Sequence, residues 1–563
     1  MSMFALRVVT RTDGVPAPTR NDRCATPRRR GAYLPLLVAL GLMPVRLGAQ
    51  ESSPDLIVTD AKVFTADSTR LWAEAFAVRR DRIIAVGTTI EMRALAGART
   101  RRVNAGGRVV IPGINDAHVH LGEGSLGLTF GTRDTTPAGP TLQEVLDSLR
   151  QIAPRTPKGT WLQASLGQRI LFDPLARRAA LDVVSPDHPV LLRAPWGHGI
   201  VVNSAALRAL GIADTASDLL GGRYERDADR RLTGMLVEYD GWAPIQRAQA
   251  RQRQRDAVAA VRRDVLGRLE FGVTSVQDMA STWDAPSTQR ILREAALPVR
   301  VRVVRWPMPG AGGRQLRRWS DLPVQVAPMV SVSGVKYVLE GTPQEQGALN
   351  RTAYAGRPGW FGELNFPLDT IRAMLREALA GSDVRDQLLL HVVGDSTVVV
   401  LLTMMESLAP DSVWRTKRVR FEHASRLTGP LVARAHALGI IVAQPRSSAA
   451  YRTWLTAGIP VAYGSDGQPN PFIDFAAAVT MSNRPAEAIS REAAAIILTR
   501  GSAVAEWSEA SKGTIAPGML ADFAILSQDI FTAPAAALPS TRSVLTVVGG
   551  RVVHASGALV VPR

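Results

Sequence analysis

The sequence predicts an α/β protein with three parts: a TIM-type (β/α)8 barrel, a small β-sandwich formed from both chain ends, and a large insertion after the first barrel strand. Three observations predict this fold. Apolar runs alternate with helix-like segments through the middle of the chain. Both ends are rich in short β-type segments. About 150 residues separate the first two middle strands, far more than an ordinary connection.

Eight apolar segments are candidate barrel strands, because polar or glycine-containing turns bound them. They are residues 110–120, 272–278, 299–306, 332–340, 387–395, 419–424, 439–444 and 460–466. Between them lie helix-like segments at residues 256–270, 368–380, 396–408 and 429–438. Eight units of this kind close a barrel.

The domain boundaries follow from these segments. Residues 50–112 and 506–563 are expected to form the two parts of the sandwich, and residues 113–505 the barrel. The insertion covers residues 121–250 and should emerge at the C-terminal rim as a lid. Its aromatic residues indicate an aromatic or bulky apolar substrate or, alternatively, the core of the lid itself; they are Trp161, Trp196, Tyr224 and Trp242.

Residues 1–49 have the pattern of a signal peptide. Three arginines, Arg28 to Arg30, precede the apolar run 33–44, and Leu47-Gly48-Ala49 supplies small residues for cleavage. The sequence therefore predicts export to the periplasm or the cell exterior, through the general or the twin-arginine route. An uncleaved anchor is the alternative. We expect no stable membrane span after cleavage, because no later apolar run reaches ~18 residues.

Composition excludes several kinds of site. Cys24, the only cysteine, lies in the predicted signal, so disulfides and thiolate ligands are excluded from the mature chain. The net charge is +17, but the basic residues are scattered. Their densest cluster, residues 247–268, has helical spacing and predicts a solvated helix face rather than a nucleic-acid site. The expected partner is a small-molecule substrate, and no nucleic acid is expected to bind. The sequence leaves open whether the protein forms a homo-oligomer.

Histidine is scarce, with eight in the chain, and two of them stand two residues apart in the first strand. Side chains at i and i+2 share a face, so His118 and His120 should both point into the barrel. A divalent metal would satisfy both imidazoles, and two hydrogen-bonded core histidines are the alternative. The flanking segment 112–116 favours the metal.

Three further polar residues end apolar strands, where barrel enzymes place catalytic groups. His391, His423 and Asp466 lie on the fifth, sixth and eighth strands. Any one of them could be an ordinary core or rim residue. Together with the first-strand histidines they predict a metal centre with one or two zinc ions, or iron, manganese or nickel.

Lys336 lies inside the fourth strand, where a charged amine is costly. Carbamylation by CO2 would turn it into an anionic bridge between two metals; pairing with Glu340 or Asp466 is the alternative.

A zinc-type ion lowers the pKa of water to about 7. Asp466 is then the candidate catalytic base.

The chain resembles the amidohydrolase superfamily, in the family-3 branch that includes N-substituted formamide deformylases and YtcJ-like proteins. The resemblance rests on segments 111–120, 272–278, 421–424, 464–466 and 512–522, and inside the insertion on 198–207 and 233–238. It implies a metal set of His118, His120, Lys336, His391, His423 and Asp466. It also implies that His198 binds substrate.

The resemblance implies a metal-dependent hydrolase that cleaves an amide or formamide-type, non-peptide C–N bond with activated water. Deamination on the same scaffold, or an exported metal- or ligand-binding protein without turnover, are the alternatives. This chain departs from the family pattern at Glu340-Gly341, in the loop 342–346 and at Val392-Val393-Gly394-Asp395. These departures affect substrate identity more than metal binding.

Overall fold

The computed structural model describes residues 53–123, 126–131, 138–194, 196–309, 316–317, 322–381, 384–443 and 449–559. The predicted signal peptide, residues 1–49, lies outside these ranges. Within them, no helix has both the length and the apolar character that a membrane crossing requires.

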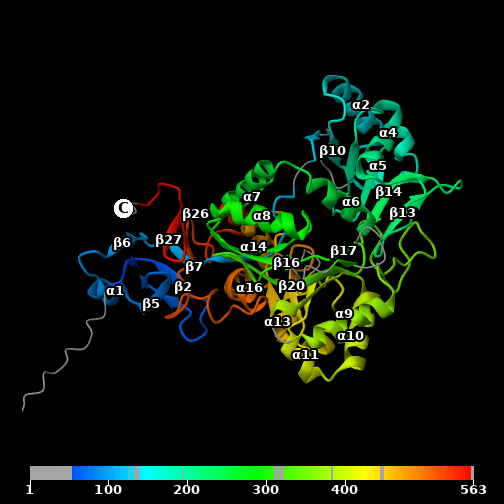
Figure 1. The fold of residues 1–563 in the computed structure, drawn as a ribbon. Coiled ribbons are helices and arrows are strands. Elements are labelled where there is room, and N and C mark those ends of the chain that lie inside the picture. The colour runs from blue at the N-terminus through cyan, green and yellow to red at the C-terminus, as the bar shows by residue number, and fades with distance from the viewer. Residues whose placement is uncertain are drawn as a thin grey trace, which may run out of the picture. The chain divides into compact units, whose positions relative to one another are not determined.

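Eight parallel strands form the central sheet in chain order (Figure 1). They are β8 (Ile114–Val119), β15 (Val273–Met279), β16 (Arg300–Arg305), β20 (Val330–Val338), β21 (Leu388–Val392), β22 (Arg420–His423), β23 (Ile441–Ala443) and β24 (Val461–Ala462). Backbone bonds close the circle: Ala117 donates to the Tyr463 carbonyl at 2.8 Å, and Asp466 donates to the His118 carbonyl at 2.8 Å. The predicted barrel is confirmed.

Helices alternate with these strands. The principal ones are α7 (Gln254–Leu269), α8 (Ala285–Ala295), α9 (Leu368–Ala380), α10 (Asp395–Leu408), α11 (Asp411–Lys417), α12 (Pro430–Ala437), α13 (Tyr451–Thr456), α14 (Pro471–Thr480), α15 (Arg491–Ile496) and α16 (Ser502–Val504). All of these except α16 turn apolar residues toward one large core shared with the barrel strands, as Val261 and Val265 of α7 do. This is the outer ring of a (β/α)8 fold.

The predicted first strand, residues 110–120, is in fact two strands. β7 (Val109–Pro112) ends in the terminal sheet, and β8 begins the barrel. Gly113 joins them: its amide donates to the Asp522 carbonyl at 2.9 Å, whereas the next amide, of Ile114, donates to Gly272 at 3.0 Å. A Cβ at Gly113 would collide with the side chain of Thr274, so glycine permits this change of sheet.

Both chain ends build the β-sandwich, as predicted (Figure 1). One sheet has the order β5 (Arg82–Gly87), β4 (Ala75–Arg79), β1 (Leu56–Thr59), β6 (Arg101–Asn104). The other has the order β27 (Arg551–Ala555), β26 (Ser543–Val548), β25 (Phe523–Leu526), β7, β2 (Lys62–Phe64), β3 (Trp72–Ala73). A common apolar core joins the two sheets, in which Phe76 and Phe523 pack edge to face at 4.9 Å.

The insertion has a six-stranded sheet of its own, in the order β13 (Gly222–Arg226), β14 (Leu232–Glu238), β12 (Gly199–Val202), β11 (Val190–Arg193), β10 (Leu162–Ser165), β9 (Leu128–Thr129). Alternate residues of β11 and β12 face two different cores. The helices α2 (Leu142–Ile152) and α4 (Arg178–Val184) cover one face, and α5 (Ser204–Leu210) and α6 (Tyr239–Gln249) cover the other. Trp161 and Tyr224 belong to the second core, so they pack the insertion itself.

Arg268 corrects the prediction that residues 247–268 form a solvated face. Its side chain is 2% exposed and donates to Asp116 Oδ2 at 2.9 Å and to Ser465 Oγ at 3.0 Å. Asp116 Oδ1 accepts the Ser465 amide at 2.9 Å. The helical spacing explains the difference, because Arg268 continues the buried stripe of Val261 and Val265.

We expect Arg268→Met to lower the free energy of unfolding by roughly 3–5 kcal/mol, because it leaves the buried Asp116 carboxylate without a cation. The double variant Arg268→Met/Asp116→Asn should lose less than the two single changes summed. Arg255→Met is the control on the same helix, because Arg255 is exposed; it should change stability by less than about 0.5 kcal/mol. Urea and thermal unfolding measure these values, and strict additivity would contradict the proposed pairing.

Candidate active site

Closure of the barrel brings His118 and His120 next to Asp466. His118 lies in β8, His120 follows it, and Asp466 lies four residues after β24. Asp466 Oδ1 is 3.3 Å from His120 Nε2 and 3.7 Å from His118 Nε2. One ligand atom from each of the three lies within 4.8 Å of the other two, which is a geometry that could hold a metal ion.

A second pair of imidazoles lies beside this group. The rings of His391, in β21, and His423, in β22, are 4.4 Å apart, and His423 is 5.6 Å from His118. His391 Nε2 is buried and has no hydrogen-bond partner. An unsatisfied buried nitrogen is costly in a protein interior, and a cation would satisfy it. The structure therefore brings together all four predicted barrel histidines.

His423 reaches this cluster through its backbone. Strand alternation places Arg420 and Glu422 on the interior face, which would turn His423 outward. His423 and Ala424, however, have left-handed φ angles of 69° and 49°, and Asp466 has one of 49°. Such angles are rare outside glycine and gather at functional sites.

Burial and neighbouring charges shift the pKa values of the clustered side chains. Burial and the nearby Lys336 ammonium lower the pKa of His118 to about 4. Burial and the neighbouring His423 lower the pKa of His391 well below its usual value. Burial alone would raise the pKa of Asp466, but His118 and His120 hold it well below the usual range. Burial alone would lower the pKa of His120, but the Asp466 carboxylate raises it. The neutral imidazoles of His118 and His391 and the ionised Asp466 carboxylate fit a divalent cation.

Lys336 projects from β20 into the same cluster. Its Nζ lies 3.3 Å from His118 Nε2 and 5.3 Å from the centre of the Trp306 ring. Burial lowers the pKa of this amine to about 8. Glu340, one of its two expected partners, is engaged elsewhere: it accepts hydrogen bonds from the backbone amides of Leu349, Val393 and Gly394 and from the Thr397 hydroxyl.

Glu422 is a site residue that the sequence reasoning missed. Its Oε2 lies 2.6 Å from His118 Nδ1, and Arg420 Nε donates to its Oε1 at 2.9 Å. The Nδ1 of His120 is similarly bound, 2.8 Å from Ser281 Oγ. Both rings therefore turn Nε2 toward Asp466, as metal-binding histidines do when an outer partner holds their other nitrogen. The position of Glu422, two residues after Arg420 on one strand face, was the available signal.

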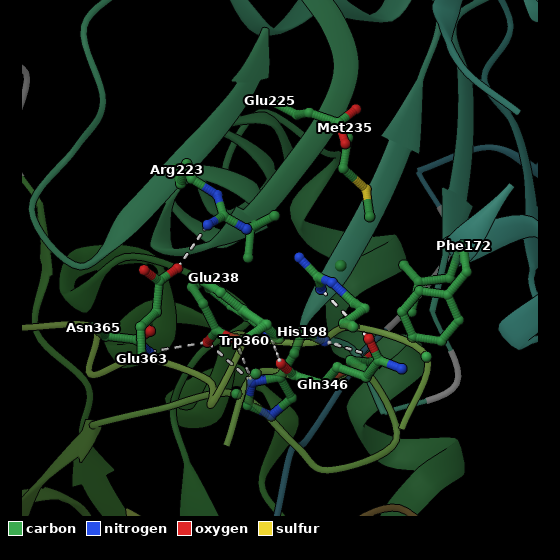
Figure 2. A pocket seen from close by; sticks show the side chains of 18 of the residues that line it. Phe172, His198, Arg223, Glu225, Met235, Glu238, Gln346, Trp360, Glu363 and Asn365 are labelled. Atoms are coloured by element: carbon green, nitrogen blue, oxygen red, sulfur yellow. Dashed lines mark hydrogen bonds and ion pairs between the residues drawn. The ribbon is translucent and has the colours of Figure 1, made fainter. Parts of the chain in front are cut away.

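His198 approaches the cluster from the insertion. Its ring lies 4.9 Å from that of His391 and 5.2 Å from that of Trp242. Its Nδ1 is 2.9 Å from Glu238 Oε1, and Asn365 Nδ2 donates to Glu238 Oε2 at 3.1 Å (Figure 2). Burial alone would lower the pKa of His198, but the Glu238 carboxylate raises it to about 9.

His198 also lines a cavity of about 490 Å³. One wall comes from the insertion and includes Phe172, Arg223 and Met235; the other comes from the segment after β20 and includes Gln346 and Trp360 (Figure 2). Because His198 contacts His391, the cavity lies next to the histidine cluster. None of the candidate metal ligands is among the residues that line the cavity, and His198 links the cavity to the cluster.

Several known proteins are similar to this chain in sequence. LONG AFTER FAR-RED 3 of Arabidopsis thaliana is 27% identical over 88% of this chain and 91% of its own length. YtcJ of Bacillus subtilis (strain 168) is 27% identical over 81% of this chain and 90% of its own length. N-substituted formamide deformylase of Arthrobacter pascens is 33% identical over 33% of this chain and 34% of its own length.

Solved structures share the fold. An uncharacterized metal-dependent hydrolase from Pyrococcus horikoshii OT3 aligns with a TM-score of 0.62 and 17% identity, over 85% of this chain and 99% of its own. Atrazine chlorohydrolase TrzN from Arthrobacter aurescens TC1, complexed with zinc, aligns with a TM-score of 0.50 and 17% identity, over 89% and 95%. The sequence profile of the amidohydrolase family matches residues 101–554 and confirms the predicted resemblance. The chain belongs to the amidohydrolase family.

Proposed function

We propose that this protein is a metal-dependent hydrolase that cleaves the C–N bond of an amide or formamide other than a peptide. The observation that carries the proposal is the convergence of His118, His120 and Asp466 beside the unsatisfied nitrogen of His391, next to a cavity. The similarity to a protein named N-substituted formamide deformylase supports the choice of bond.

The residues fall into two groups that could each hold a divalent ion. His118, His120 and Asp466 would hold one ion, and His391 and His423 would contribute to a second. Lys336 lies close to His118 and would act as a ligand of both ions if it were carbamylated. In that reaction its nitrogen bonds the carbon of CO2 and loses a proton. The ions would be zinc, or iron, manganese or nickel. They would supply Lewis-acid polarisation of the carbonyl and acidification of water.

Asp466 is the proposed general base. Its carboxylate lies at the strand ends and is ionised, so it can take a proton from the attacking water and pass it to the leaving nitrogen. The water oxygen bonds the carbonyl carbon, the C–N bond breaks, and a carboxylic acid and an amine result. His198, fixed by Glu238 at the cavity, is placed to donate a hydrogen bond to the substrate.

Glu422 would act through His118. It binds Nδ1 of that ring and so leaves Nε2 as the ligand atom. Loss of such an outer partner usually weakens metal binding without removing a ligand.

Metal analysis of the purified protein tests the ligand set. We expect one or two divalent ions per chain, no more than trace metal in His118→Ala, and a metal affinity roughly 10–100-fold lower in Glu422→Gln. The control His554→Ala changes a histidine of β27 that bonds the Ser543 carbonyl, and it should keep the full metal content. Full metal content in His118→Ala would show that the assignment is wrong.

A hydrolysis screen of N-formyl, N-acyl and aryl amides tests the activity, with acid and amine both identified by mass spectrometry. Asp466→Asn should lower kcat/KM roughly 10²–10⁴-fold, because the proton transfer loses its base. Release of ammonia from amino-substituted rings, with no amide cleaved, would instead identify a deaminase. Metal content without turnover of either class would identify a binding protein.

A further inference from the structure

The segments in which this chain departs from the family pattern meet at Glu340. This residue follows β20, and its Oε1 accepts the backbone amides of Val393 and Gly394 at 2.7 and 2.8 Å. Its Oε2 accepts the Leu349 amide at 2.6 Å and the Thr397 hydroxyl at 2.7 Å. One carboxylate thus joins the turn after β21 to the loop that runs from Glu340 to Leu349.

Four donors at Glu340 need four acceptor sites. The side chain is buried, and all four donors are uncharged. A carboxylate offers only acceptors, whereas glutamine has one acceptor oxygen and an NH2 group that would face two of these donors. A Cβ at Gly394 would collide with the Leu349 carbonyl and with the Glu340 carboxylate, so glycine permits the close approach. Glu340→Gln should therefore open this contact while changing little in size.

The loop held by Glu340 forms one wall of the cavity. Four of its residues line the cavity: Gly341, Glu345, Gln346 and Gly347. Figure 2 shows Gln346 on this wall. Glu345 Oε1 accepts the His198 amide at 3.2 Å, so the loop also contacts the residue that links the cavity to the histidine cluster.

The turn after β21 belongs to the strand of a candidate metal ligand. His391 lies in β21, two residues before Val393, whose amide binds Glu340. The Ser396 amide donates to the Leu349 carbonyl at 3.2 Å and supports the same contact. Glu340 therefore connects the wall of the cavity to the strand that carries His391.

We propose that Glu340 is a positioning residue that determines how tightly the substrate binds, because it fixes the cavity wall relative to His391. This role rests on the proposed amide hydrolysis and adds a specificity-determining contact to the same site. The scissile carbonyl lies at the metal cluster, and a long substituent extends past His198 into the cavity. Loss of the Glu340 contact displaces the wall, so it weakens the binding of long amides and leaves short amides, which end before the wall, almost unchanged.

A purely structural role for Glu340 predicts a different result. If the contact only stabilised the fold, Glu340→Gln would lower the fraction of folded enzyme and reduce the rates for all substrates by one factor. The ratio of kcat/KM between two substrates does not depend on the amount of active enzyme. This ratio therefore separates positioning from stability.

The experiment uses N-alkylformamides and N-alkylacetamides with methyl, propyl and hexyl groups. In Glu340→Gln we expect kcat/KM for the hexyl amides to fall at least about tenfold, mainly through a higher KM, as loss of a hydrogen bond to a charged group would produce. For the methyl amides the change should stay within about twofold. The metal content should equal that of wild type.

Thr397→Val is a milder second variant in case Glu340→Gln does not fold. It removes one of the four donors and keeps the glutamate. We expect kcat/KM for the hexyl amides to fall about threefold, with the methyl amides unchanged.

Glu406→Gln is the control, because Glu406 lies on the same helix as Thr397, is exposed and pairs with Arg434. It should leave both rates and their ratio unchanged. An equal fall for methyl and hexyl amides, a loss of metal in Glu340→Gln, or a wild-type preference for the methyl amides would overturn the positioning role and leave amide hydrolysis standing.

If wild type hydrolyses no amide, the proposed function fails, and amide hydrogen exchange still tests the contact. The amides of Leu349, Val393 and Gly394 should exchange at least about tenfold faster in Glu340→Gln than in wild type, with α7 unchanged. Equal exchange in both proteins, or faster exchange throughout the chain, would overturn the positioning role.

Discussion

Closure of the barrel between its first and last strands is the constraint on which the candidate site depends. His118 and Asp466 are separated by most of the chain and meet only because β8 and the segment after β24 are hydrogen-bonded neighbours. The Asp116–Arg268–Ser465 contact links the same two segments. Arg268 comes from α7, so the outer helical ring stabilises the junction. The relative positions of the candidate metal ligands therefore depend on the fold as a whole.

The polar interior of the barrel follows from that geometry. His118 needs an acceptor at Nδ1, which Glu422 provides, and a buried carboxylate needs a cation, which Arg420 provides. The remaining guanidinium hydrogens then need acceptors of their own. Arg420 donates to the Gln277 side chain at 2.5 Å and to the Ala117 carbonyl at 2.9 Å. Each buried polar group requires the next, so the usual branched apolar layers are replaced by a connected network.

The periodicity of apolar residues along the sequence predicted the regular features of the fold. The number and order of the strands, the sandwich of both ends and the His118–His120 pair all follow from local patterns. His423 shows the limit, because strand alternation turns it away from the cluster, and only its left-handed backbone turns it back. Glu422 and Arg268 were missed for a different reason. The partners that place them beside the site lie far away in the chain: His118 for Glu422, and Asp116 for Arg268. Neither strand nor helix periodicity identifies a distant partner.

The candidate metal ligands and the cavity come from different parts of this molecule. The candidate ligands come from the barrel strands, whereas the cavity is made by the insertion and the loop after β20. Glu238 joins the two: its φ of 56° is strained, and its carboxylate lies against Gly341, where a Cβ would approach Oε1 to 2.9 Å. The next residue, Tyr239, accepts the Val338 amide at 3.1 Å with its hydroxyl oxygen. The insertion is thus fixed to the strand that carries Lys336.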